Sequence, residues 1–374
     1  MARPVLKTPL CELLGIEYPI LLAGMGGGDG FARAELAAAV SEAGGLGIIG
    51  AAGWTAEQIH DECEKVRSLT KKPFGIDILL PASAENPPAN VADIDPAYNA
   101  WAEGAIERLG LQAPPPSPAP APDGLTPRQR QDRQVEAIIS EKPKLMAAGL
   151  GSPEPYVKSL HAADIVVLGL VGNVKTARRV KDGGADIVVA QGHEAGGHTG
   201  RVGSFALTPQ VVDAIAPTPV VVAGGVGDGR GLAAALALGA QGVWVGTAFL
   251  ATNEAHVLPV HKQRFVEMGE EDTRISRLFS GKTLRHPYTE LTDDWERSGL
   301  KALPMGVQGT VSNKVQAAAR HSGRDDLLYQ PAGQIVGLVK QIRPAAEVLD
   351  EMVRGAIEVI ESLQRQKVTI AVST

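Results

Sequence analysis

The sequence of 374 residues predicts a (β/α)8 barrel, also called a TIM barrel, with a smaller added subdomain. Short apolar runs recur along the chain, and stretches of helical periodicity separate them. Runs such as Ile165-Val-Val167 and Ile187-Val-Val189 lack polar alternation, which indicates strands buried on both faces. Strand, helix and strand at this spacing predict parallel strands with right-handed crossovers. A series of eight strands favours a closed barrel, with an open doubly wound sheet as the alternative.

The predicted elements alternate along most of the chain. The first four strands are expected over residues 19–23, 46–49, 74–79 and 144–148. The last four are centred near Ile165, Ile187, Val221 and Val243. Helices are expected between strands, over residues 33–42, 55–68, 156–161, 174–181, 209–215 and 230–238.

Three segments divide the chain around this repeat. Residues 1–260 are predicted to form the barrel, with a proline-rich insertion over residues 111–127. The seven prolines of this insertion predict an extended surface segment between strands three and four. Residues 261–338 are charged and irregular, which predicts an added cap subdomain. Residues 339–374 carry an amphipathic helix over 345–364, expected to pack back on the barrel.

Composition restricts the classes of partner. The formal net charge is −6 and no basic block stands out, so a nucleic acid is not expected to bind. Cys11 and Cys63 cannot form a disulfide framework and are interpreted as small buried residues. The first residues lack the pattern of a signal peptide, and no apolar run has the length of a membrane span. We therefore expect a cytoplasmic enzyme that acts on small molecules.

The loop after the sixth strand, Gln191-Gly-His-Glu-Ala-Gly-Gly-His-Thr-Gly200, carries the densest set of chemical groups. Its glycines let backbone amides approach a flat or anionic ligand. His193 and His198 are candidate bases; we interpret His193 as structural and His198 as functional, with a structural role as its alternative. The zinc signature His-Glu-x-x-His has a different spacing, and the paired glycines oppose a helix here. No metal site is predicted.

Glycine-rich turns follow the last two strands. Ala223-Gly-Gly-Val-Gly-Asp-Gly229 follows the seventh strand, and Gly246-Thr247 follows the eighth. In this class of barrel, such turns together with a helix start cradle a phosphate through backbone N–H groups. No glycine fingerprint of a Rossmann unit follows the first strand, because Gly24-Met-Gly-Gly-Gly-Asp29 breaks it. A phosphate-bearing cofactor is therefore expected at the end of the barrel.

These motifs together resemble the nitronate monooxygenase (2-nitropropane dioxygenase) family. The resemblance rests on Pro19-Ile-Leu-Leu-Ala-Gly-Met25, Pro73-Phe-Gly-Ile-Asp77, Gln191 to His198, Ala223-Gly-Gly225 and Trp244-Val-Gly-Thr247. It covers residues 9–251, with weaker support from Ala332-Gly-Gln-Ile-Val-Gly337. The same family pattern includes flavin-dependent enoyl-ACP reductases and some CoA-thioester dehydrogenases.

The resemblance implies that the barrel holds FMN. By position, it implies that Gly24 and Met25 lie against the isoalloxazine, and that Gln191 and Gly196 contact the ring or its ribityl chain. It places the phosphate at the turns formed by Gly225, Trp244, Val245, Gly246 and Thr247. Two residues depart from the family pattern. Asp77, near the flavin, replaces the usual Asn, and Trp244 is bulkier than expected.

The function implied is oxidation of alkyl nitronates by FMN and O2 to a carbonyl compound and nitrite. His198, which matches the family histidine facing the substrate, would be the base for neutral nitroalkanes, with a pKa expected near neutrality. One alternative is an enoyl-thioester reductase that uses NAD(P)H, or a CoA-thioester dehydrogenase, in the same pocket. An alternative of another class is a barrel that binds flavin or phosphate without catalysis.

Overall fold

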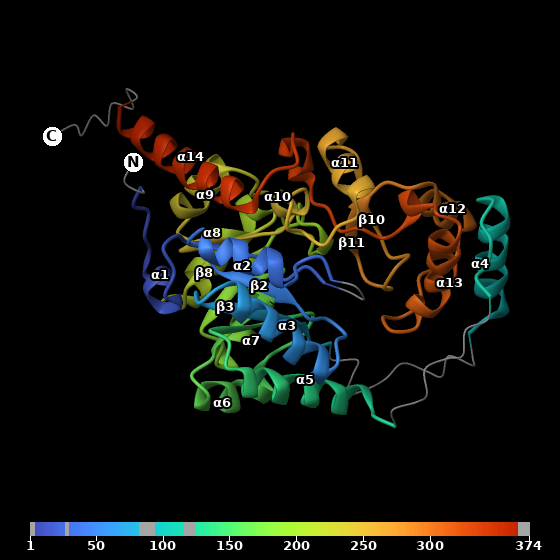
Figure 1. Ribbon diagram of the computed structural model, residues 1–374, viewed down its shortest axis with the longest axis horizontal. Coiled ribbons are helices and arrows are strands. Elements are labelled where there is room, and N and C mark those ends of the chain that lie inside the picture. Colours follow the sequence, from blue (N-terminus) through green and yellow to red (C-terminus); the bar gives the residue numbers. More distant parts are fainter. Residues whose placement is uncertain (1–3, 27–29, 82–93, 116–123, 366–374) are drawn as a thin grey trace.

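Eight parallel strands form the barrel in the computed structural model, which describes residues 4–26, 30–81, 94–115 and 124–365 (Figure 1). The strand order is β1-β9-β8-β6-β5-β4-β3-β2, so the predicted closed barrel is confirmed. A parallel bridge between Leu21 and Leu46 joins the two edge strands of this order. The strands are β1 Ile20–Leu22, β2 Gly47–Gly50, β3 Phe74–Leu79, β4 Leu145–Gly149, β5 Val166–Val171, β6 Ile187–Gln191, β8 Val220–Ala223 and β9 Gly242–Val245.

Side chains alternate between two apolar layers because successive residues of a strand point to opposite faces. The barrel interior contains Leu21, Ile48, Leu168 and Val189, all fully buried. The N-terminal helix α1 (Pro9–Leu14) adds Leu10 and Leu14 to this inner layer. The outer layer, between strands and helices, includes Ile20, Ile49, Ile76 and Val243. The two layers leave polar side chains mainly at the strand ends, where a site can form.

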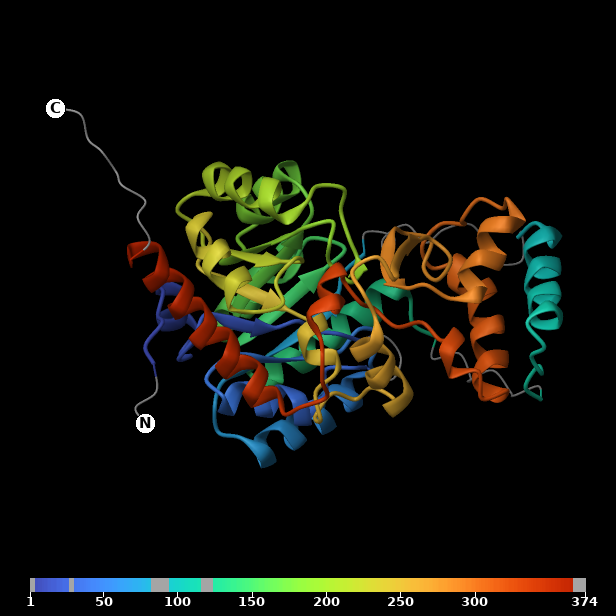
Figure 2. The same cartoon turned by 90° about the horizontal axis from the view of Figure 1, so that it is seen from above.

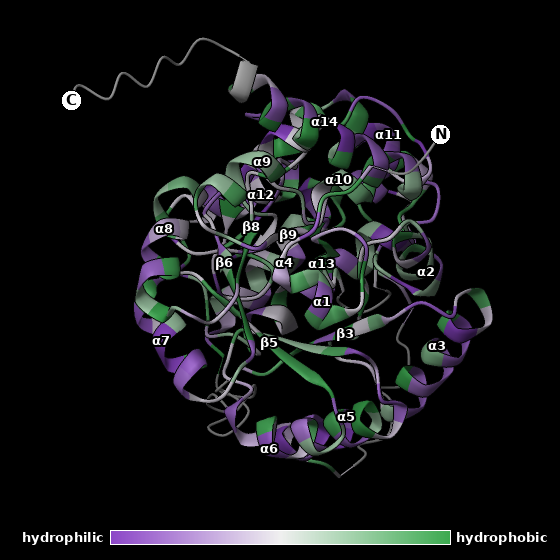
Figure 3. Cartoon of the chain, turned by 90° about the vertical axis from the view of Figure 1, so that its left-hand side faces the viewer, coloured by the Kyte–Doolittle hydropathy of each residue, from purple (hydrophilic) through white to green (hydrophobic). Residues whose placement is uncertain are grey.

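Helices surround the strands, as the view along the barrel shows (Figure 3). They are α2 Ala34–Glu42, α3 Ala56–Leu69, α5 Pro127–Glu141, α6 Glu154–Ala162, α7 Val174–Asp182, α8 Ser204–Ile215, α9 Gly229–Ala237, α10 Thr247–Leu250 and α14 Ala345–Arg365. The long helix α14 lies across the barrel against α9 and also contacts α2 (Figure 2). Within the described residues, no helix has the length and apolar character needed to cross a membrane.

Helices α8 and α5 differ from the sequence prediction. Helix α8 begins at Ser204, five residues before the predicted start, because the Glu194 carboxylate accepts hydrogen bonds from the Ser204 N–H and hydroxyl. Helix α5 begins at Pro127, the last proline of the predicted extended segment, and Thr126 caps it. The rest of that segment is a loop at residues 111–115, while residues 116–123 lie outside the described chain.

A smaller lobe lies beyond the carboxyl ends of the barrel strands (Figures 1 and 2). Its sheet has the order β10-β11-β7, in which β7 comes from the loop after β6. The elements of this lobe are α4 Pro96–Arg108, β7 Gly197–His198, β10 Thr273–Ser276, β11 Leu284–Pro287, α12 Glu290–Ser298, α13 Gln308–His321 and η3 Asp325–Leu327. Helices α11 Pro259–Glu267 and η4 Gln334–Leu338 pack with the barrel instead, since Phe265 and Val336 belong to its outer apolar layer.

Helix α4 packs in the core of this lobe, although the sequence division assigned residues 1–260 to the barrel. Trp101 of α4 contacts Trp295 of α12 edge to face, with ring centroids 4.9 Å apart. The buried Asp294 carboxylate accepts hydrogen bonds from Trp101 Nε1 at 2.9 Å and from two Arg108 nitrogens. Apolar burial and these charge-assisted hydrogen bonds place α4 away from the barrel.

Candidate active site

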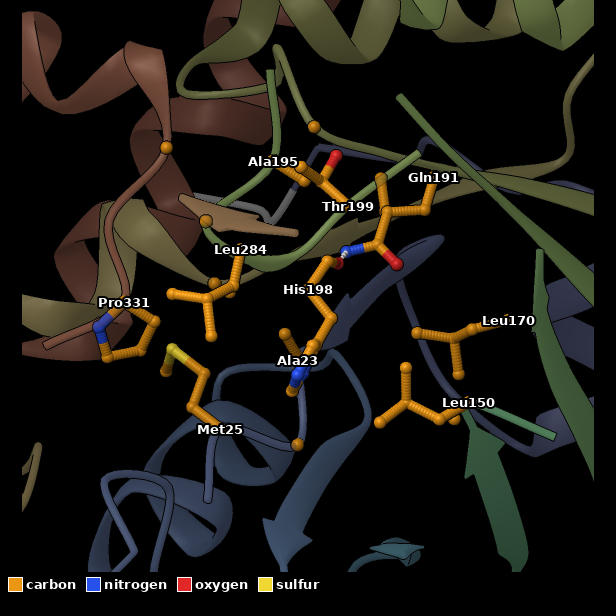
Figure 4. Close-up of a pocket in the computed structure, with 18 of the residues that line it drawn as sticks. Ala23, Met25, Leu150, Leu170, Gln191, Ala195, His198, Thr199, Leu284 and Pro331 are labelled. Carbon is orange, nitrogen blue, oxygen red and sulfur yellow. Dashed lines mark hydrogen bonds between the residues drawn. The ribbon is translucent and has the colours of Figure 1, made fainter. Parts of the chain in front are cut away.

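One cavity of about 1520 Å³ opens at the carboxyl ends of the barrel strands and extends beneath the smaller lobe. Catalytic sites of (β/α)8 enzymes occupy this end of the barrel. Ten of the eleven predicted site residues line the cavity, including residues far apart in sequence (Figure 4). They are Gly24, Met25, Asp77, Gln191, Gly196, His198, Gly225, Trp244, Gly246 and Thr247.

Val245 is the exception, since its side chain does not line the cavity. Its side chain is buried in the layer between strands and helices, with 1% exposure. Its neighbour Trp244 points the opposite way, into the barrel interior. The alternation of β9 is the physical reason, since adjacent residues of one strand face opposite sides.

His198 is held between the barrel and the smaller lobe. It lies in β7, which pairs with β11 so that His198 is opposite Leu284. Its carbonyl accepts a hydrogen bond of 2.9 Å from Gln191 Nε2, drawn in Figure 4. Its Nε2 lies 2.8 Å from Ser280 Oγ in the loop between β10 and β11. The smaller lobe therefore sets the orientation of this imidazole.

The expected near-neutral pKa of His198 is wrong. Burial, together with the nearby Lys282 ammonium, lowers the pKa of His198 to about 4. Both effects disfavour the protonated ring, because a buried cation loses hydration and a second cation repels it. The imidazole is therefore neutral at physiological pH, and the proton-accepting form is the one present.

His193 lies in the same loop without lining the cavity. Its Nδ1 is 3.0 Å from the Gly200 carbonyl oxygen, and its own carbonyl accepts hydrogen bonds from Arg285. The two histidines of the loop thus have different surroundings. Among the described residues, no group of three or more His, Cys, Asp and Glu side chains is arranged to hold a metal ion.

The glycine turns after β8 and β9 form one wall of the cavity. Gly224 and Gly225 have φ values of +83° and +74°, a conformation that side chains disfavour. Gly225 leaves open space, since an added Cβ would meet no atom closer than 3.5 Å. Helix α10 has four residues, so its start supplies backbone N–H groups rather than a strong dipole.

A distant segment completes this wall. The Ala332–Gly333 backbone lies against Gly196, where an added Cβ would approach to 2.7 Å. Gly333 N donates to Thr247 Oγ1 at 2.9 Å, and Gln334 N donates to the Glu194 carbonyl at 3.0 Å. The weak sequence match near residue 332 therefore packs directly on the stronger motif.

Asp77 lies in β3, two residues before the strand ends, and points inside the barrel. Its side chain is 8% exposed, and its Oδ1 has no hydrogen-bond partner within the described chain. The Gly24 backbone packs on it so tightly that an added Cβ would lie 2.1 Å from Asp77 Cβ. Burial raises the pKa of Asp77 to about 8. A carboxyl group in this state is protonated at physiological pH.

The cavity contains functional groups that sequence reasoning missed. Ser280 and Lys282 come from the irregular segment, and Tyr329 lies beside Gly197 with its ring 4.9 Å from that of Phe279. Burial raises the pKa of the Tyr329 hydroxyl above its usual range. No local pattern marks these residues, because tertiary packing brings them to the site: the pairing of β7 with β11 in the case of Ser280 and Lys282, and contact with Phe279 in the case of Tyr329.

Cationic side chains gather around the cavity. Arg179, Arg201, Arg277 and Lys282 all line it and are exposed, and none forms an ion pair with another described residue. The acidic lining residues are Asp77 and Glu194, both directed into packed surroundings. The entrance is thus positive in a protein of net charge −6.

Comparison with known proteins gives the family. The family model described as nitronate monooxygenase matches residues 7–355. A Mycobacterium tuberculosis protein named as a candidate monooxygenase is 36% identical, over 96% of this chain and 99% of that protein. A Staphylococcus haemolyticus protein named probable nitronate monooxygenase is 33% identical, over 95% of this chain and 99% of its own.

Solved structures agree with this assignment. Nitroalkane oxidase from Streptomyces ansochromogenes matches with a TM-score of 0.81 and 29% identity, covering 95% of this chain and all of that one. FabK from Thermotoga maritima matches with a TM-score of 0.76 and 30% identity, and the match covers 96% of this chain and 99% of FabK. The alternative of a non-catalytic binding barrel is thereby overturned. The chain belongs to the nitronate monooxygenase family and is a flavin-dependent oxidoreductase.

Proposed function

We propose that this enzyme binds FMN and oxidises alkyl nitronates with O2 to a carbonyl compound and nitrite. One observation carries the proposal: the neutral His198 imidazole and the glycine turns after β6, β8 and β9 line a single cavity. A binding site for a planar cofactor and a proton acceptor are therefore next to each other. The family match and the likeness to a nitroalkane oxidase support the same chemistry.

The residues of the cavity fit a flavin. Met25, Leu150 and Leu170 offer apolar surface for a planar ring, while Asp77 and Gln191 offer polar groups. The open backbone at Gly225 and the turn at Gly246 and Thr247 would hold the phosphate through N–H groups. These turns suit a single phosphate, which favours FMN over FAD. When bound, the flavin supplies the electron transfer, and the protein supplies position and electrostatics.

His198 is the proposed base for neutral nitroalkanes. Because Ser280 engages Nε2, the nitrogen without a partner in the described chain is Nδ1, to which we assign proton acceptance. A pre-ionised nitronate has already lost this proton and needs the residue less. The cationic entrance favours the ionised substrate, since positive charge concentrates anions near the cavity.

A second candidate is reduction of an enoyl thioester with NAD(P)H. Two observations favour it. The cavity is larger than the usual range of ligand sites, about 300–1,000 Å³. Its positively charged entrance would also accept a phosphorylated substrate. The structural neighbours include FabK, an enoyl-ACP reductase. A small nitronate would leave more of this volume unfilled than a thioester would.

Anaerobic reduction separates these two functions. Purified protein is first heated, and the released flavin is identified by mass as FMN or FAD. The flavin-loaded enzyme is then mixed without oxygen with propyl-2-nitronate, NADH or NADPH, and its visible absorbance is followed. Bleaching by the nitronate is the expected result. Bleaching by a pyridine nucleotide alone would support the enoyl-thioester function instead.

A further inference from the structure

Asp77 is a charged residue type in an apolar part of the cavity. Alternation along β3 directs Ile76 and Ile78 to the outer layer and Asp77 to the barrel interior. The strands on either side of β3 pair Gly50 and Ala147 with Asp77. Neither neighbour offers a polar side chain, so the carboxyl group is surrounded by backbone and aliphatic carbon.

No charged group faces Asp77 from the elements packed against it. The described residues of β2, β4 and the turn at 23–26 contain no titratable side chain. His198, Lys282 and Glu194 line the same cavity, but burial is the single cause of the raised pKa of Asp77. A positively charged partner that lowered the pKa of Asp77 would therefore have to belong to a bound ligand.

The carboxyl group also lacks a polar partner within the described chain. Asp77 Oδ1 makes no hydrogen bond within the described residues, and no ion pair links the side chain to another described element. Burying a polar group without a hydrogen bond is unfavourable, and an apolar residue here would avoid that cost. The cost is offset if a bound molecule supplies the missing partner.

We propose that Asp77 is a carboxylic acid that keeps its proton in the free enzyme and donates it in a hydrogen bond to the bound flavin ring. This inference rests on the proposed flavin site, since the cavity wall formed by Gly24 and Asp77 must face the ring. It adds a positioning residue whose charge state decides how tightly the cofactor is held. Ionised Asp77 would lose the donor and place a negative charge beside the ring.

The consequence is cofactor binding that depends on pH. Binding selects the protonated form of Asp77, so the pKa of this group rises further in the complex. Flavin affinity is then constant below the pKa of the free enzyme and falls by about tenfold per pH unit above it. With a pKa near 8 in the free enzyme, the fall begins in the mildly alkaline range.

The experiment compares wild type with Asp77→Asn, in which a neutral amide of the same shape replaces the acid. Flavin-free protein is titrated with riboflavin and with FMN from about pH 6 to pH 9.5, and the dissociation constant is followed by flavin fluorescence. Riboflavin removes the titration of the FMN phosphate from the comparison. We expect the wild-type dissociation constant to rise at least about tenfold above pH 8, while that of Asp77→Asn stays flat.

A second measurement does not depend on the dissociation constant. The infrared difference spectrum of wild type, with and without flavin at neutral pH, should contain a protonated carboxyl stretch that shifts on binding and is missing in Asp77→Asn. Identical pH profiles in the two proteins, or no shifted carboxyl band, would overturn the role of Asp77 while leaving the flavin site intact. Failure of the folded wild type to bind any flavin would instead overturn the proposed function.

Discussion

The neutral state of His198 determines what its replacement should do. The pKa of this residue, lowered to about 4 by burial and by Lys282, leaves the imidazole ready to accept a proton at physiological pH. We expect His198→Ala to lose about 10²- to 10⁴-fold in kcat/KM on neutral nitroalkanes, the usual contribution of a positioned base. Pre-ionised nitronates should lose far less. Steady-state rates on both substrates, with flavin content measured in the same samples, test this.

The pH profile of the same reaction gives an independent reading. The neutral imidazole is the active form, so kcat/KM on neutral nitroalkanes should fall only as the pH drops through about 4, well below the ordinary histidine value. Equal losses on both substrates together with loss of flavin would show that His198 is a scaffold residue. Catalysis would then have to be explained by the glycine turns and not by the imidazole.

Among the elements, the turn after β8 is the proposed phosphate site. Gly225→Val would place a branched side chain in the open space beside the backbone, where an added Cβ meets nothing closer than 3.5 Å. Loss of two charge-assisted hydrogen bonds, at about 1.5–3 kcal/mol each, should weaken FMN binding at least tenfold. Titration of the flavin-free protein measures the change.

Gly299→Val is the matched control for this turn. Gly299 also has a positive φ, +69°, but lies at the end of α12 with nothing near its Cβ position. The Gly299→Val variant should have similar backbone strain but unchanged affinity for FMN. An unchanged dissociation constant in folded Gly225→Val would place the phosphate elsewhere in the cavity.

The strand β11 connects the smaller lobe to the loop after β6 through Arg285. This buried guanidinium donates to the His193 carbonyl and, at 3.0 Å, to Thr273 Oγ1. Arg285→Met should lower the free energy of unfolding by about 1.5–3 kcal/mol, since it leaves these acceptors without a charged donor. Urea unfolding followed by circular dichroism measures this. The control Arg274→Met, on the exposed side of β10, should change it by less than about 1 kcal/mol.

At the scale of the whole molecule, the entrance of the cavity is positively charged, whereas the net charge of the protein is negative. Because the exposed cations lining the cavity attract anions, kcat/KM on nitronates should fall about three- to tenfold between roughly 0.02 and 0.5 M salt. The neutral nitroalkane should respond little. In the double variant Arg201→Gln/Arg277→Gln, the dependence of kcat/KM on salt should be smaller for nitronates. The variant Arg178→Gln, on the outside of α7, should behave as wild type. A salt effect of the same size on both substrates would argue against electrostatic guidance.

The barrel and most of the cavity wall could be predicted from local sequence. Strands such as Val166–Val171 and Ile187–Gln191 are apolar on both faces, and this pattern depends only on neighbours along the chain. The glycines after β6, β8 and β9 are similarly local, because a close backbone approach requires them whatever surrounds them. Helix α4 was missed, since its partner Trp295 lies almost two hundred residues away.

Tertiary structure alone decided the chemical state of the two central side chains. Sequence identified His198 and Asp77 as site residues, but their pKa values depend on burial and on which groups lie across the cavity. Ser280 and Lys282 reach His198 only because β11 pairs with β7, a contact over more than eighty residues that no local pattern encodes. Burial raises the pKa of Asp77, and the strands packed beside it bring no cation that would lower it. Short-range periodicity thus determined the scaffold, while long-range packing determined the pKa values of the side chains in the cavity.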